Sequence, residues 1–180
     1  VAVGGSRVAL AVERLEDTAV KVAALVGFPF GAADADVKRY ETEVAIDAGA
    51  QEIHCVAHPG WVREGNLAAL IRELRDVREA ADERPVTAVF EWSLLDADGM
   101  RRAVEATLES EVQFLATGTG CAVRRATPED LRELREWAGP ELGLAAVVGA
   151  WSEPEAAALV AAGANRIGVL SLAPRAASAT

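Results

Sequence analysis

The fold is decided by the stretch from Val20 to Ile53, VKVAALVGFPFGAADADVKRYETEVAIDAGAQEI. The short apolar run at Lys21–Val26 is typical of a buried strand, and Ala35–Ala48 carries apolar residues at helical spacing. Gly49 marks the end of that helix, and a second strand is predicted at Glu52–Val56. Two strands joined by a helix in this way lie parallel in one sheet that is buried on both faces.

The same alternation continues along the rest of the chain. It predicts seven strands, near Val1–Val3, Lys21–Val26, Glu52–Val56, Thr87–Phe90, Val112–Leu115, Leu144–Val147 and Arg166–Val169. It predicts helices between them, at Arg7–Leu15, Ala35–Ala48, Leu67–Ala81, Ala97–Leu108, Pro128–Trp137 and Pro154–Ala161. Thr127 before Pro128 offers an N-cap followed by proline at the first helical position.

Repeated βα units favour an α/β fold of the (β/α)8 TIM-barrel type, with its first βα unit missing from this chain. The chain begins in a strand without an initiating Met, which places the expected gap at the front. No linker or low-complexity tract interrupts the pattern, so residues 1–180 are expected to form a single domain. An open, doubly wound parallel sheet would also accept seven strands.

Composition narrows the class of function. The net charge of −10 argues against nucleic acid and anionic membranes as partners, because both require a positive patch. No apolar run approaches the roughly 18 residues of a membrane span, and a cytoplasmic protein is expected. Cys55 and Cys121 are expected to be reduced thiols, and no Cys/His spacing indicates a metal site.

Five ordered motifs carry a family resemblance. They are GFPFG within the first quoted stretch, GWVREGN at Gly60–Asn66, VTAVFEWSLL at Val86–Leu95, FLATGTG at Phe114–Gly120 and AGANRIG at Ala162–Gly168. In order and spacing they resemble the deoxyribose-phosphate aldolase family. The resemblance implies a TIM barrel rather than a doubly wound sheet, and an ancestral lyase activity that proceeds through a Schiff base.

The same resemblance implies that the Schiff-base chemistry has been lost. It places the imine-forming lysine at Ala116 and a second active-site lysine at Ala145. The only lysines are Lys21, expected at the bottom of the barrel, and Lys38, expected on a helix face in solvent. Imine formation needs a primary amine of depressed pKa at the barrel mouth, so we do not expect a Schiff-base aldolase.

The phosphate site implied by the resemblance has also changed. The family's Ser-Gly-Gly reads Val147-Val148-Gly149, and its Gly-Thr-Ser-Ser reads Gly168-Val169-Leu170-Ser171. Bulky side chains crowd the backbone N–H groups that would bind phosphate at this end of a barrel. A phosphorylated sugar is therefore a poor candidate substrate.

Catalysis in such barrels takes place at the carboxyl ends of the strands, where a few polar residues remain. His54 stands where the family has a proton-relay aspartate, and we predict it as an acid or base that Glu91 orients. The alternative is that both residues only fill space. Predicted substrate-binding residues are His58, Trp92, Thr117, Thr119 and Trp151.

Two functions follow as hypotheses. The first is acid–base chemistry on a largely apolar small molecule, such as a cyclisation, dehydration or isomerisation of secondary metabolism, without cofactor or metal. The second is a non-catalytic binding or scaffold protein, in which a homodimer contact or another subunit covers the uncovered barrel edge. A third possibility is that the protein would be named deoxyribose-phosphate aldolase from family membership alone, and the sequence supports that name only as a statement of ancestry.

Overall fold

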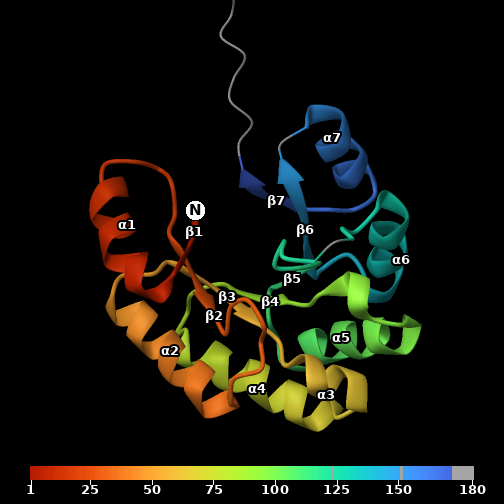
Figure 1. The fold of residues 1–180 in the computed structure, drawn as a ribbon, viewed down its shortest axis with the longest axis horizontal. Coiled ribbons are helices and arrows are strands. Elements are labelled where there is room, and N and C mark those ends of the chain that lie inside the picture. The colour runs from red at the N-terminus through yellow and green to blue at the C-terminus, as the bar shows by residue number, and fades with distance from the viewer. Residues whose placement is uncertain (123, 151, 172–180) are drawn as a thin grey trace, which may run out of the picture.

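A curled sheet of seven parallel strands forms the centre of the molecule (Figure 1). The structure is a computed structural model that describes residues 1–122, 124–150 and 152–171. The strands pair in chain order and are β1 (Ala2–Gly4), β2 (Ala23–Val26), β3 (Glu52–Val56), β4 (Val86–Val89), β5 (Phe114–Ala116), β6 (Gly143–Ala150) and β7 (Arg166–Ser171). The prediction of seven strands in a TIM-barrel-like fold is confirmed.

Helices cover the convex side of the sheet (Figure 1). They are α1 (Val8–Leu15), α2 (Ala35–Asp47), α3 (Pro59–Glu64), α4 (Leu67–Ala80), α5 (Ala97–Glu109), α6 (Pro128–Ala138) and α7 (Glu153–Ala161), with 3-10 turns η1 (Gly5–Arg7) and η2 (Trp92–Leu94). The sequence did not predict α3, η1 or η2, because each is too short to show a helical period. The predicted cap at Thr127 is present: its hydroxyl oxygen accepts from the N–H of Asp130 at 3.2 Å.

The two faces of the sheet have different contents because side chains alternate along each strand. Residues such as Leu115 and Leu144 point outward and pack against the helices in the main apolar core. The inward face carries a small separate cluster, whose members are Val56, Val89, Ala116 and Ala145, with Val147 against it. The concave side is therefore lined by small side chains at this level.

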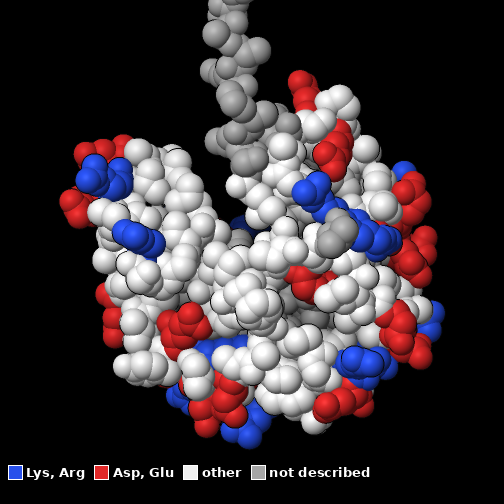
Figure 2. All heavy atoms as spheres, in the orientation of Figure 1, with Lys and Arg blue, Asp and Glu red and all other residues white. Residues whose placement is uncertain are grey.

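The curl of the sheet brings distant strands together across the concave side. Arg166 of β7 lies 2.7 Å from Glu52 of β3, and its guanidinium carbon lies 3.6 Å from the ring centroid of Phe114 on β5. In the described part of the chain no pairing joins β1 to β7, which are the two edges of the sheet. Figure 2 shows the surface hollowed between the α1 side and the β6–β7 side.

Lys38 differs from its expected place in solvent, because it is fully buried. Its ammonium group lies 2.5 Å from Glu73 Oε1 on α4 and donates to the carbonyl of Val56 at 2.8 Å. The reason lies in helix periodicity: Lys38, Thr42 and Ala45 are spaced four and three residues apart and form the buried face of α2. That face packs against α4, which supplies the counter-ion.

We predict that Lys38→Met destabilises the protein by about 3–5 kcal/mol, because the carboxylate of Glu73 would stay buried without its partner. The double variant Lys38→Met/Glu73→Leu should recover most of that loss. Arg39→Met is the matched control: it breaks the exposed pair with Glu43 and should cost at most about 1 kcal/mol. Urea unfolding measures all three, and equal effects of Lys38→Met and Arg39→Met would contradict the prediction.

Candidate functional site

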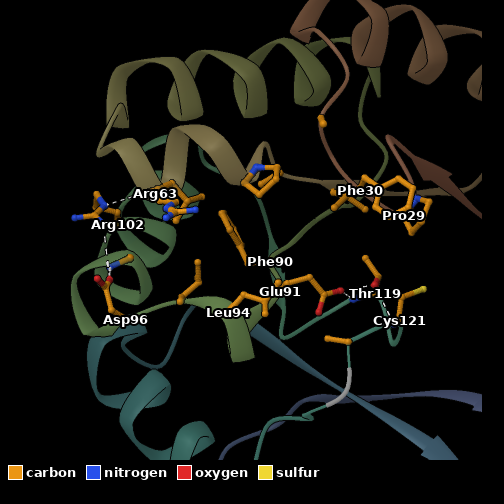
Figure 3. Close-up of a pocket in the computed structure, with 18 residues that line it drawn as sticks. Pro29, Phe30, Arg63, Phe90, Glu91, Leu94, Asp96, Arg102, Thr119 and Cys121 are labelled. Atoms are coloured by element: carbon orange, nitrogen blue, oxygen red, sulfur yellow. Dashed lines mark hydrogen bonds and ion pairs between the residues drawn. The ribbon is translucent and has the colours of Figure 1, made fainter.

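A cavity of about 850 Å³ opens at the carboxyl ends of β2 to β5 (Figure 3). This is the end of a βα barrel where binding sites form, and the volume suits a small organic molecule. Most of the lining is apolar, from Pro29, Phe30, Val56, Val62, Phe90, Leu94 and Leu95. The polar lining residues include Arg63, Glu91, Asp96, Arg102, Thr119 and Cys121.

Glu91 and Thr119 form the polar centre of this cavity. Glu91 follows β4, and Thr119 lies in the loop after β5. The N–H of Thr119 donates to Glu91 Oε1 at 2.6 Å, and the Thr119 hydroxyl donates to the same oxygen. Gly118 leaves room for this contact, since a Cβ there would lie 3.2 Å from Glu91 Oε2. The carboxylate is thus held in one orientation by a neighbouring loop.

His54 lies on β3, opposite Leu25 and Thr87 in register, and is half-buried. It shares the inward face with Glu52 and Val56 because side chains alternate. Burial lowers the pKa of His54, the charge of Glu52 opposes this, and that of Arg166 adds to it. His54 does not line the cavity, and no hydrogen bond joins it to Glu91 among the described residues. The structure therefore does not bring the predicted catalytic pair into contact.

His58 begins α3 as its N-cap rather than lying free at the rim. Its Nδ1 accepts from the N–H of Trp61 at 3.3 Å, and the two rings stack with centroids 4.3 Å apart. Its own N–H donates to Glu73 Oε2 at 3.0 Å. Burial, with a contribution from Lys38, lowers the pKa of His58. In the described ranges no group of three or more His, Cys, Asp or Glu could hold a metal ion.

Thr117 and Trp92 were predicted to bind substrate, but in the structure both side chains make contacts inside the protein. Thr117 is buried, and its hydroxyl oxygen accepts from the N–H of Val147 at 3.2 Å, between β5 and β6. Trp92 is fully buried in η2, with its ring centroid 6.4 Å from that of Trp137 on α6. At the start of η2, Glu91 lines the cavity, whereas Trp92 is buried against the helix layer. Trp92 is therefore not exposed to a ligand in the cavity. Trp151 lies outside the described residues.

Helices supply a part of the cavity that the sequence did not predict. Arg63 and Val62 come from α3, and Asp96 and Arg102 come from the start and middle of α5. None of these residues lies at the end of a strand, where the family places its chemistry. One signal was present: Arg63 belongs to the GWVREGN motif already quoted for the resemblance.

We predict that the protein loses stability as the pH falls through the His54 titration. The folded pKa lies below the unfolded value near 6.5, so the unfolded chain binds the proton first and acid favours unfolding. His54→Gln should flatten this dependence between about pH 7.5 and the lower folded pKa. Urea midpoints across pH measure it; because burial also lowers the pKa of His58, His58→Gln should flatten the profile too, and the double variant should be flatter than either single variant. An unchanged pH profile in His54→Gln would contradict the assignment.

Solved structures with similar folds include aldolases. A protein described as "QR15, an Aldolase" superposes with a TM-score of 0.87 at 27% identity, covering 93% of this chain and 75% of that one. A putative deoxyribose-phosphate aldolase from Coccidioides immitis superposes with a TM-score of 0.88 at 26% identity, covering 93% and 67%. No protein-family model matches the chain. No described helix is both long and apolar enough to cross a membrane.

Curated relatives agree with the structural comparison. The deoxyribose-phosphate aldolase of Exiguobacterium sibiricum is 41% identical over 169 residues, covering 93% of this chain and 76% of the relative. That of Streptococcus gordonii is 39% identical over 171 residues, covering 95% and 78%. With this identity over most of both chains, and with the matching fold, the chain belongs to the deoxyribose-phosphate aldolase family.

Proposed function

We propose that this chain is a divergent family member that forms no imine and performs acid–base chemistry on a largely apolar small molecule. The observation that carries the proposal is the pairing of Ala116 on β5 with Ala145 on β6. These are the positions where the resemblance places the two lysines, and both lie in the inward cluster. A methyl side chain offers no nitrogen to attack a carbonyl, so covalent catalysis of the family's type has no nucleophile here.

Neither lysine of the chain can take over that role. Lys38 is fully buried, and its ammonium group is bonded to Glu73 and to the carbonyl of Val56. Lys21 is exposed and precedes β2, at the opposite end of the strands from the cavity. An amine that attacks a carbonyl must face the substrate, and neither lysine faces the cavity.

Two groups are proposed to exchange protons. Thr119 holds Oε1 of Glu91, which leaves Oε2 as the acceptor for a ligand. His54 is the second group: burial lowers its pKa, and because it does not line the cavity it would act on the ligand only through an intervening group. It lies two residues before Val56 on the same inward face, one level below the cavity wall. The reaction class that fits is a cyclisation, dehydration or isomerisation.

We propose that the family's phosphate-binding site is lost as well. Val147 is half-buried, and its side chain packs beside Gly168, where an added Cβ would lie 3.2 Å from Val147 Cγ2. A β-branched side chain in this position crowds the backbone that would receive a phosphate group. The apolar lining of the cavity supports an apolar ligand in place of a sugar phosphate.

Trapping with borohydride tests the proposal. Brief incubation with acetaldehyde and sodium borohydride should give no adduct beyond the slow modification of exposed amines such as Lys21, because no amine faces the cavity to form a reducible imine there. The aldolase of Exiguobacterium sibiricum serves as the positive control under the same conditions. Intact-mass spectrometry followed by peptide mapping measures the outcome, and a reduced adduct on Lys21 or Lys38 formed as fully as the adduct on the control would overturn the proposal.

A binding or scaffold role is the second candidate, and the two sheet edges favour it. Val1 beside β1 and Leu170 on β7 are 58% and 55% exposed, on the two sides of the opening. Uncovered strand edges with apolar side chains are normally buried by association. A deoxyribose-phosphate aldolase of the same fold, from Aeropyrum pernix, is described as tetrameric.

The association expected from this second candidate is a homodimer or a contact with another subunit. Light scattering after size-exclusion chromatography should give at least twice the chain mass, falling on dilution if the contact is weak. Leu170→Asp should shift the protein toward the monomer, whereas Leu108→Asp, an exposed position on α5, should not. A monomer at every concentration would rule out self-association.

A further inference from the structure

The charged groups of the cavity are divided between its two ends (Figure 3). Arg63 of α3 and Arg102 of α5 lie at one end, and Glu91 with Thr119 lies at the other, with Phe90 between them. The chain as a whole carries a net charge of −10. Two guanidinium groups lie at one end of an apolar cavity. The local charge there is therefore positive, although the chain as a whole is negative.

The arginine end keeps an uncompensated positive charge. Arg102 donates through Nε to the carbonyl of Val62 at 3.0 Å, and its guanidinium lies 3.9 Å from Asp96 Oδ1. Asp96 also caps α5 by accepting from the N–H of Gly99 at 2.7 Å. Among the described residues the side chain of Arg63 makes no ion pair and no hydrogen bond. Asp96 thus pairs with Arg102 alone, and the exposed guanidinium of Arg63 lines the cavity without a carboxylate partner among the described residues.

The opposite end repels anions. The carboxylate of Glu91 is fixed by Thr119, so its charge stays at that end of the cavity. Between the two ends the walls are apolar, formed by Val62, Phe90 and Leu94. A ligand with one negative charge and an apolar body therefore has a single favourable orientation, with the charge at Arg63.

We propose that the cavity binds a monocarboxylic acid with an apolar body, whose carboxylate pairs with Arg63 beside Arg102. Guanidinium groups bind carboxylates through paired N–H donors, and a single uncompensated charge matches a monoanion rather than a phosphate dianion. The free oxygen of Glu91 then faces the other end of the ligand. This assignment deepens the proposed function and rests on its cavity, but not on the absence of an imine.

Calorimetric titration with two probes tests the assignment. The probes are 4-phenylbutanoate and 4-phenylbutanamide, which have the same apolar body and differ in charge at one end. The carboxylate should bind about tenfold more tightly or better, and the difference should shrink as salt is raised. Inorganic phosphate is the third titrant and should neither bind nor compete.

Matched variants locate the effect. Arg63→Gln should abolish the preference for the carboxylate, whereas Arg39→Gln, an exposed arginine on α2 outside the cavity, should keep it. Equal affinity for the two probes, an unchanged preference in Arg63→Gln, or displacement of the carboxylate by phosphate would each overturn the assignment. If neither probe binds, the cavity is not this ligand's site and the inference fails, while the borohydride result still decides separately whether an imine forms.

Discussion

The ion pair between Lys38 and Glu73 holds together the elements from which the cavity is built. Lys38 comes from α2 and Glu73 from α4. The ammonium group also donates a hydrogen bond to the carbonyl of Val56 at the end of β3. The carboxylate accepts a hydrogen bond from the N–H of His58 at the start of α3. Val56 and Pro59 border the cavity, so this pair fixes part of its wall. Because both groups are buried, each needs its partner.

Small side chains occupy the inward face of the strands, so the polar groups near the cavity lie in the loops that follow the strands. Ala116 and Ala145 lie beside each other on β5 and β6, so these two strands offer no amine at this level of the inward face. The polar groups come from the loops above the strands, where Thr119 holds the carboxylate of Glu91. In the proposed function the site therefore lies in the loops and helices that surround the apolar cavity, rather than on the strands where the resemblance places the lysines.

Much of the fold could be predicted because strands and helices leave local signals. The apolar runs that became β2 and β3, and the helical period of α2, were visible in the sequence. The helix α3 was missed, since six residues are fewer than two turns. The burial of Lys38 was not predicted for a different reason. Lysine is usually exposed to solvent, and it is buried only where it is paired with a partner such as Glu73.

The sequence by itself determined which functional groups exist: two lysines, two histidines, and alanine at positions 116 and 145. The tertiary structure decided which of them meet. Thr119 came to Glu91 because β4 and β5 are neighbours, whereas His54 remained a level below the cavity on β3. Arg63 and Arg102, far apart in the chain, share one end of the cavity because α3 packs against α5. Such contacts depend on the packing of whole elements, which no local pattern of residues encodes.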